Sequence, residues 1–431
     1  MHPASVSGDG DVLTVCAGGS LRGELQVPGD KSISHRALLL AALADGSSAI
    51  SGLSDGADVA ATAGAVRALG ATVEPTGKAV LVRGGELRES PGPIDVGNSG
   101  TTIRLLAGIA AGCPFTTVLG GDASVNRRPM DRVAEPLRLM GAEVTGVDGG
   151  RRAPLRIAGG GLRGISWQPP VASAQVKGAL LLAGLFAAGE TVVREPVATR
   201  AHTEEMLATF GADVRVAGGE VTVRASRPAP FDFAVPGDPS AAAFWAVGAA
   251  LVPESEVTVR GVYQGQGRDG YLRVLERMGA DLSVVPAGDR RVDVTCRSGP
   301  LQGVTVAASE VSDLIDEIPV LAVAAATAGG PSRFEGVGEL RHKESDRLRS
   351  VVEGLAALGA PAEAEGDTLV VHGGARLRAG NLDAAGDHRI AMAFCVGGLA
   401  AAGGETVISG WRSVATSYPG FLEDLARCRV S

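Results

Sequence analysis

The chain has 431 residues, more than one hydrophobic core usually supports, so two domains are expected. Its formal net charge of -8 and its 3% aromatic residues exclude nucleic acid as an expected partner, since no basic face and no stacking platform is visible. The apolar runs are shorter than a membrane span, and the N-terminus lacks the features of a signal peptide. We therefore expect a cytoplasmic protein that has no membrane partner and acts as a monomer.

The cysteines form neither a Cys-x-x-Cys pair nor a cluster with histidine. They stand at Cys16, Cys113, Cys296, Cys395 and Cys428. This spacing indicates a reducing compartment without a disulfide framework, and it offers no zinc site. We expect neither a metal nor another cofactor.

Five segments of the chain end in a hydrophobic residue followed by Gly-Ala, and a strand-like run follows each of them. Their glycines are Gly70, Gly141, Gly211, Gly279 and Gly359. Glycine ends a helix readily because it enters the left-handed region at little steric cost. Between these segments lie six longer Ala-, Leu- and Gly-rich stretches, predicted as helices that begin near Lys31, Asn98, Gln175, Pro239, Leu314 and Asp387. The chain therefore contains six units with a period of about 70 residues, too long for the common solenoid repeats.

The six longer helices have no polar face, and such helices are usually buried. We expect two domains of three units each, with the buried helices inside and the sheets outside. The segment 236–239, Pro-Gly-Asp-Pro, separates the third unit from the fourth. An ordinary doubly wound α/β protein is the alternative interpretation.

The first long helix begins with charged and polar residues. A glycine turn before a helix leaves free N–H groups and the positive end of the dipole, which suit an anion, and Lys31 lies there. Ser32 and Arg36 are four residues apart and share a face. The alternative is a capping serine with surface charges. It explains Ser32, but it does not explain Lys31 and Arg36 beside an apolar helix.

The second and third helices begin in a similar way. Asn98 or Ser99 can cap the second helix, and Gly100 allows a ligand to approach the backbone. Ser173 and Gln175, at the start of the third helix, offer neutral hydrogen bonds for hydroxyls or a phosphate.

The fifth helix is predicted to begin with the three carboxylates Asp313, Asp316 and Glu317. The helix dipole explains one or two of them, whereas a general base explains a buried one. At the sixth helix, Asp387 is the expected cap, and Arg389 follows it.

The run 341–347 is dense in charge, and its spacing predicts that Lys343, Glu344 and Arg347 share one helical face. A solvated charged face is the alternative. Because such residues recur at corresponding places of a repeat, we expect them to converge between the domains and to bind two phosphorylated substrates.

Only four of the 40 basic residues are lysine, and Lys31, Lys177 and Lys343 are three of these. A lysine kept against this bias indicates a need for a compact ammonium.

Eight segments resemble the 5-enolpyruvylshikimate-3-phosphate (EPSP) synthase family, in that family's order and along nearly the whole chain. They read GDKSISHRALLLAAL, GNSGTTIRL, GDASVNRRPMDRV, ASAQVKGALLLAGL, TRAHTEEML, LIDEIPVLAV, HKESDRL and GDHRIAMAF. The resemblance implies an α/β fold of the inside-out barrel type with six βαβαββ units, three in each domain. It implies one domain at 29–237, and a discontinuous one at 1–28 plus 238–431.

The resemblance also implies a reaction, in which the enolpyruvyl group of phosphoenolpyruvate (PEP) moves to the 5-hydroxyl of shikimate 3-phosphate (S3P), giving 5-enolpyruvylshikimate 3-phosphate and phosphate. This step belongs to the shikimate pathway, which leads to chorismate and the aromatic amino acids. Asp316 would be the base for the hydroxyl, Glu344 would move the proton of the PEP methylene, and Lys31 would lie between the substrates. S3P would be bound by Lys31, Ser32, Arg36, Ser173, Gln175, Arg200, Asp316 and Lys343. PEP would be bound by Lys31, Gly100, Arg128, Gln175, Arg347 and Arg389. The neighbouring Arg127, as a partial substitute for Arg128, stays an alternative.

Two positions depart from the enterobacterial pattern of that family. Thr416 occupies the region where those members carry a PEP-binding lysine, and Glu339 stands where they carry an asparagine. The nearest rival is UDP-N-acetylglucosamine enolpyruvyl transferase, which has a reactive cysteine in a Gly-Gly-Cys loop. Here the loop reads Gly120-Gly121-Asp122, and Cys113 on the preceding helix end is expected to be a packing residue. A non-catalytic repeat scaffold is the rival from another class.

Overall fold

The computed structural model describes residues 6–430 of the chain, and these divide into two compact units. Unit 1 comprises the N-terminal residues up to Pro28 together with the chain from Pro236 onward, and unit 2 comprises Gly29–Val235. The chain therefore passes from one unit to the other at 28/29 and at 235/236. The second position is two residues before the domain boundary expected from the sequence.

The described part of unit 2 contains seven helices, of which α1, α3 and α6 are buried along most of their length. The helices are α1 (Lys31–Leu43), α2 (Ala57–Ala68), α3 (Gly100–Gly112), α4 (Ala123–Arg127), α5 (Asp131–Leu139), α6 (Ala174–Gly184) and α7 (His202–Thr209). The strands are β4 (Ser47–Ser51), β5 (Thr72–Thr76), β6 (Ala79–Arg83), β7 (Ile94–Asp95), β8 (Thr116–Gly120), β9 (Glu143–Val147), β10 (Arg152–Ala158), β11 (Ser166–Trp167), β12 (Glu190–Arg194), β13 (Val214–Ala217), β14 (Glu220–Arg224) and β15 (Asp232–Ala234).

Unit 1 repeats this plan. Its helices are α8 (Pro239–Leu251), α9 (Gly270–Arg277), α10 (Ile318–Thr327), α11 (Arg347–Ala357), α12 (His388–Leu399) and α13 (Phe421–Cys428). Its strands are β1 (Val6–Asp9), β2 (Val12–Cys16), β3 (Ser20–Leu25), β16 (Glu256–Tyr263), β17 (Asp281–Pro286), β18 (Arg291–Arg297), β19 (Thr305–Val306), β20 (Ser332–Phe334), β21 (Ala362–Glu365), β22 (Thr368–Val371), β23 (Asn381–Asp383), β24 (Glu405–Ser409) and β25 (Arg429–Val430). Short 3-10 helices cover 308–313, 338–342 and 411–416.

The described strands form six separate sheets, three in each unit. In unit 2 their orders are β15-β4-β6-β5, β7-β8-β10-β9 and β11-β12-β14-β13. In each sheet the first pair is parallel and the next two pairs are antiparallel. In unit 1 the strands β3-β16-β18-β17, β19-β20-β22-β21 and β23-β24-β2-β1 follow the same rule, and β25 adds a fifth strand to the first of these sheets, antiparallel to β3. Six equivalent sheets confirm the six-unit interpretation, and the doubly wound alternative is wrong.

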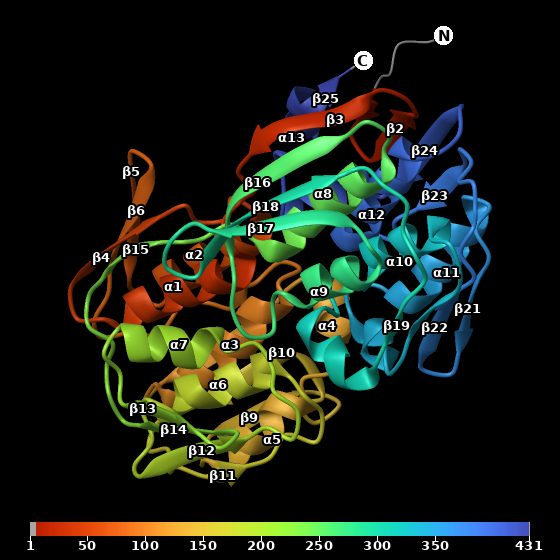
Figure 1. The fold of residues 1–431 in the computed structure, drawn as a ribbon. Coiled ribbons are helices and arrows are strands. Elements are labelled where there is room, and N and C mark those ends of the chain that lie inside the picture. The colour runs from red at the N-terminus through yellow and green to blue at the C-terminus, as the bar shows by residue number, and fades with distance from the viewer. Residues whose placement is uncertain (1–5, 431) are drawn as a thin grey trace. The chain divides into compact units, whose positions relative to one another are not determined.

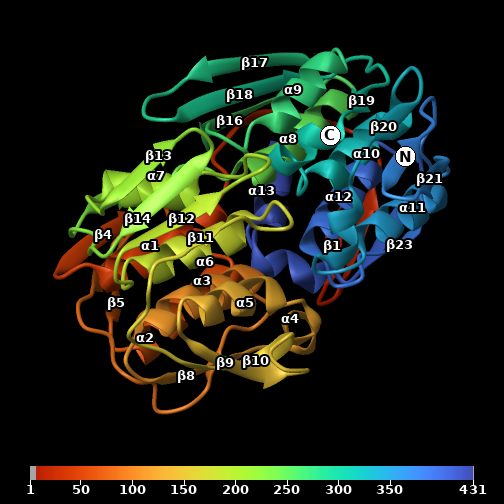
Figure 2. The ribbon, with the colours of Figure 1, turned by 90° about the horizontal axis from the view of Figure 1, so that it is seen from below.

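The long helices of each unit lie inside it. In unit 1, α8, α10 and α12 pack against one another, and the strands β16 and β18 pack against α8 (Figures 1 and 2). In unit 2, α3 and α6 lie side by side (Figure 1). Gly108 of α3 leaves no room for a side chain, because an added Cβ would lie 2.0 Å from the carbonyl oxygen of Ala179. Small residues are therefore what allows these inner helices to pack closely.

The glycine helix ends are confirmed. Helices α2, α5, α7, α9 and α11 end just before their Gly-Ala pair, and Gly70, Gly141, Gly211, Gly279 and Gly359 all have φ between 78° and 111°. None of the described helices has both the length and the apolar character needed to cross a bilayer.

Candidate active site

In unit 2, the starts of the long helices gather charged and polar side chains. Asp30 caps α1 by accepting from the Ile33 amide at 2.8 Å, so the interpretation of Ser32 as a cap is wrong. Lys31, the first residue of the helix, forms a 3.0 Å ion pair with Asp58. One turn later Arg36 is 3% exposed, and its guanidinium donates to the Ser32 carbonyl at 2.9 Å and to the Thr203 hydroxyl at 2.7 Å. A guanidinium this deeply buried is unusual and requires such acceptors.

The start of α3 is arranged around Gly100 and Arg128. Ser99 is the cap, and it accepts from the Thr102 amide at 3.1 Å. Arg128 is 7% exposed and donates to the Asn98 side chain at 2.8 Å. A Cβ added at Gly100 would lie 2.5 Å from the Nη1 atom of Arg128, so the glycine makes room for this guanidinium. Arg127 is the last residue of α4 and is exposed, whereas Arg128 is buried. The two neighbouring arginines therefore differ in their burial.

Arg104 connects several of these residues, and no sequence pattern predicts this role. Its guanidinium donates to the Gln175 side chain at 2.8 Å, to the Gly100 carbonyl at 3.2 Å and to the Pro129 carbonyl at 3.2 Å. Gln175 in turn donates to Thr101 at 3.0 Å. Of the other predicted residues, Ser173 caps α6, and Arg200 lies half-buried in the segment between β12 and α7.

Unit 1 brings the expected carboxylates together around one buried arginine. Arg347 is 1% exposed and donates to Asp316 at 2.9 Å, to Glu344 at 2.5 Å and to Asp387 at 2.8 Å. Lys343 lies 3.3 Å from the same oxygen of Asp316. Burial opposes the charged form of Arg347, but Asp387, Glu344 and Asp316 together raise its pKa above the usual value. The guanidinium is therefore fixed as a cation between the two predicted proton-transfer groups.

Arg389 differs from Arg347 in its partners. It is 5% exposed, and its Nε has no hydrogen-bond partner among the described residues. A buried guanidinium donor without an acceptor costs free energy unless a ligand supplies one. Arg389 is therefore suited to accept an anion at the start of α12.

Two predictions of local structure in unit 1 are wrong. The fifth long helix begins at Ile318 and not near Leu314, because Pro319 occupies its first turn, and 314–317 form a turn. Helix α11 begins at Arg347 with Asp346 as its cap, so Lys343 and Glu344 do not share its face. The contact between Glu344 and Arg347 is instead made from the segment that precedes the helix.

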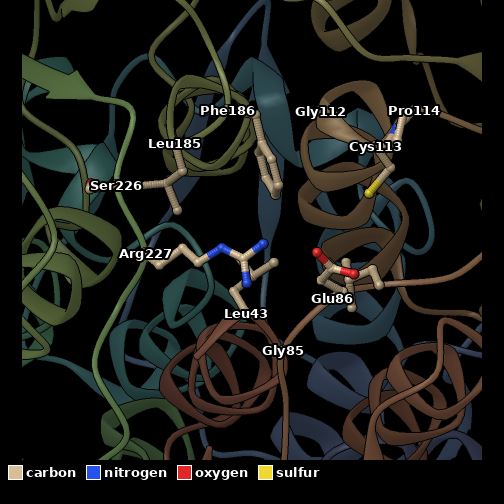
Figure 3. Close-up of a pocket in the computed structure, with 11 residues that line it drawn as sticks. Leu43, Gly85, Glu86, Gly112, Cys113, Pro114, Leu185, Phe186, Ser226 and Arg227 are labelled. Carbon is tan, nitrogen blue, oxygen red and sulfur yellow. The ribbon is translucent and has the colours of Figure 1, made fainter. Parts of the chain in front are cut away.

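Unit 2 also has a cavity of about 310 Å³ at the opposite ends of its long helices (Figure 3). Leu43, Gly112 and Leu185 mark the ends of α1, α3 and α6, and Cys113 also lines it. Burial raises the pKa of Cys113 to about 12, so its thiol is protonated and is not a nucleophile at neutral pH. Helix ends of this kind present carbonyl oxygens, which disfavour phosphate. The helix starts, not this cavity, are therefore the candidate site in unit 2.

Comparison with known proteins decides the family. A model of the EPSP synthase (3-phosphoshikimate 1-carboxyvinyltransferase) family matches residues 15–425. The chain belongs to the EPSP synthase family. A 3-phosphoshikimate 1-carboxyvinyltransferase of Anaeromyxobacter sp. (strain K) is 49% identical over 98% of this chain and 96% of its own length. The one of Chloroflexus aurantiacus (strain ATCC 29366 / DSM 635 / J-10-fl) is 46% identical over 96% of this chain and 98% of its own.

Solved structures agree with this assignment. The EPSP synthase of Acinetobacter baumannii matches with a TM-score of 0.86 and 37% identity, covering 98% of this chain and 99% of that one. The enolpyruvyl transferase NikO of Streptomyces tendae has a TM-score of 0.79 at 20% identity and covers 97% of this chain and 98% of that one. That second likeness concerns the fold alone. The inside-out α/β fold expected from the sequence is thus confirmed.

The structure describes Thr416, one of the two departures from the enterobacterial pattern, and Asp122 in the loop that lacks the rival family's cysteine. Thr416 lies 3.1 Å from Nδ1 of His388 and donates to the Ser413 carbonyl at 2.7 Å. Asp122, in the loop where the rival family has its cysteine, caps α4 by accepting from the Val125 amide at 2.8 Å. It also accepts from Asn98 at 2.6 Å, so this residue holds the loop in place.

Within residues 6–430, no group of three or more His, Cys, Asp or Glu side chains is placed to bind a metal ion.

Proposed function

We propose that the chain transfers the enolpyruvyl group of PEP to the 5-hydroxyl of S3P, and that the residues described above do this work. The observation that carries the proposal is the contact of one buried guanidinium, that of Arg347, with both Asp316 and Glu344. A general base and a general acid are the two groups that the reaction needs. The family membership supports the choice of reaction, because the relatives are named as 3-phosphoshikimate 1-carboxyvinyltransferases.

In the proposed reaction, the 5-hydroxyl oxygen of S3P attacks C2 of PEP while Asp316 takes its proton. Glu344 delivers a proton to C3, which becomes a methyl group and makes C2 electrophilic. The tetrahedral intermediate then loses phosphate, Glu344 takes a proton back from the methyl group, and the proton held by Asp316 passes to the departing phosphate. Every atom is accounted for, and the chemistry requires no redox partner.

The cations have the complementary role of binding and stabilising negative charge. We assign Lys31, Ser32, Arg36, Ser173, Gln175, Arg200 and Lys343 to S3P, and Lys31, Gly100, Arg128, Gln175, Arg347 and Arg389 to PEP. Preorganised donors stabilise charge that develops on the departing phosphate more effectively than water does. Arg104 joins this proposal as the residue that holds Gln175. The cytoplasmic location and the monomeric state stay predictions from the sequence.

The test is phosphate release from PEP with purified protein. We expect release when S3P is present, and none with UDP-N-acetylglucosamine or without an acceptor. Phosphate release that depends on the UDP-sugar would favour the rival transferase. No phosphate release with any acceptor would favour a non-catalytic scaffold.

A further inference from the structure

The fourth residue of α6, Lys177, is a buried lysine to which the proposed function assigns no role. Its side chain is 0% exposed, and its Nζ donates to Glu195 at 2.7 Å and to Glu204 at 2.6 Å. The side chain of Glu204 is buried, at 4% exposure, and that of Glu195 is largely buried, at 9%. Lysine is seldom buried completely, and its desolvation must be offset by close partners of opposite charge.

The two carboxylates lie on either side of the segment that carries Arg200. Glu195 follows β12 directly, and Glu204 lies in the first turn of α7. The Thr199 hydroxyl donates to the second oxygen of Glu195 and so joins the residue before Arg200 to the same anchor. One ammonium group therefore fixes both ends of the 195–204 segment to α6.

The same turn of α7 also holds Arg36. Thr203, next to Glu204, accepts from Nε of Arg36 at 2.7 Å. On α6, the residue after Lys177 is Gly178, where an added Cβ would lie 2.9 Å from the Thr203 hydroxyl and 3.3 Å from Arg36. Lys177 and Gly178 thus set where α7, Thr203 and Arg36 can lie.

The cluster of Lys177, Glu195 and Glu204 contains one more acidic than basic side chain. One lysine faces two carboxylates, and the Oε2 atom of Glu204 has no hydrogen-bond partner among the described residues. Burial raises the pKa of Glu204, while Lys177 works in the opposite direction. A neutral Glu204 still accepts from Lys177 through Oε1, so the cluster holds α7 in either protonation state.

We propose that Lys177 is a positioning residue for the S3P subsite, acting through Glu195 and Glu204 on Arg200 and Arg36. The proposal rests on the proposed function, because it assigns those two arginines to S3P. A compact ammonium with three donors reaches two carboxylates from one point, whereas a guanidinium is larger and fixes its donors in a fork. In a chain so poor in lysine, this requirement explains why position 177 is not arginine.

The test compares Lys177→Met with Lys78→Met, in which an exposed lysine of the β5–β6 turn is changed in the same way. The S3P dissociation constant is measured by calorimetry without PEP, well below each melting temperature. Lys177→Met is expected to raise it at least about tenfold, because displaced binding groups lose affinity steeply. The KM for PEP stays within about twofold, because the affected arginines bind only S3P. Lys78→Met leaves both values unchanged. A folded Lys177→Met variant with wild-type S3P affinity overturns the proposal.

A second variant keeps the proposal testable if Lys177→Met does not fold. Glu195→Gln removes the anchor of the Arg200 segment and retains the pair between Lys177 and Glu204. It is expected to weaken S3P binding about threefold to tenfold. Its control, Glu190→Gln, changes an exposed ion pair at the start of β12 and is expected to leave S3P affinity unchanged. Wild-type affinity in Glu195→Gln contradicts the proposal.

Failure of the proposed function has a different signature. A wild-type protein that does not bind S3P removes the proposed function itself, and the positioning role falls with it. A wild-type protein that binds S3P, together with Lys177 and Glu195 variants of equal affinity, removes only the positioning role.

Discussion

Arg347 and Asp387 form a buried ion pair in which Nε of the arginine donates to Oδ2 of the aspartate at 2.8 Å. The other oxygen of Asp387 accepts from the amide of Arg389 at 2.9 Å and caps α12. One carboxylate therefore positions both arginines that we assign to PEP in this unit. It also provides the negative charge that keeps Arg347 protonated despite its burial.

Replacing Asp387 with asparagine is expected to weaken PEP binding selectively. Asparagine can still cap the helix, but it cannot neutralise the buried guanidinium. We expect the KM for PEP to rise about tenfold to a hundredfold and the S3P dissociation constant to change little. Steady-state kinetics with PEP varied checks this, and an equal loss of affinity for both substrates would show that Asp387 acts on the fold alone.

Glu344→Gln tests the proton transfer at the PEP methylene. Glutamine keeps the size of the side chain and removes its proton. We expect turnover to fall by about two to four orders of magnitude, the usual contribution of general acid–base catalysis. Binding of S3P, measured by calorimetry, should be nearly unchanged. A variant with near-wild-type turnover would show that another group moves this proton.

Lys31→Arg tests whether charge alone is needed at the start of α1. Lys31 already forms a 3.0 Å ion pair with Asp58, so a larger guanidinium must displace one of its neighbours. We expect kcat/KM to fall about a hundredfold for both substrates, with little change in thermal stability. Lys78→Arg, at an exposed position, is the control. More than about half of the wild-type activity in Lys31→Arg would mean that position 31 needs only a positive charge.

Gly100→Ala tests the space beside Arg128. The new methyl group would lie 2.5 Å from Nη1 of Arg128, and the flexible end of that side chain must move. We expect the KM for PEP to rise by about tenfold or more while the protein stays folded. Gly64→Ala is a suitable control, because a Cβ at this position on α2 meets nothing within 4 Å. An unchanged KM for PEP would argue against a role of Arg128 in PEP binding.

His35 gives a prediction about stability that does not depend on the reaction. Burial, with smaller effects of Lys31 and Arg36, holds the pKa of His35 well below its usual value. The unfolded chain therefore binds a proton at about pH 6.5 that the folded chain does not, so His35 destabilises the fold progressively as the pH falls below that value. Urea unfolding between pH 7.5 and 5.5 should show a free energy of unfolding that falls up to about 1.4 kcal/mol per pH unit more steeply in the wild type than in His35→Gln. Parallel slopes would contradict this.

Local signals account for the parts of the fold that the sequence predicted correctly. The helix ends at Gly70 and Gly359 follow from the left-handed conformation that glycine adopts, and the caps Ser99 and Asp387 follow from their side chains. The sequence predicts too early a start for α10, because the carboxylates at 313–317 resemble a first turn, whereas Pro319 sets the helix start.

Contacts between distant segments could not be predicted in the same way. Arg104 meets Gln175 across 71 positions, and Lys177 meets Glu195 and Glu204 across 18 and 27. No local pattern marks these partners, because the packing of α3, α6 and α7 brings them together. The shortage of lysine in the chain is the sequence signal that marks position 177.

The most direct test of the proposed reaction is the fate of the PEP methylene in heavy water. Glu344 carries a deuteron there, so each addition forms a methyl group with one deuteron, and elimination removes either a proton or the deuteron. We predict that NMR spectroscopy of the wild-type reaction with S3P and PEP shows an enolpyruvyl ether at the 5-oxygen with deuterium in its methylene group. An enolpyruvyl ether without deuterium, or phosphate release with no ether formed, would contradict the account.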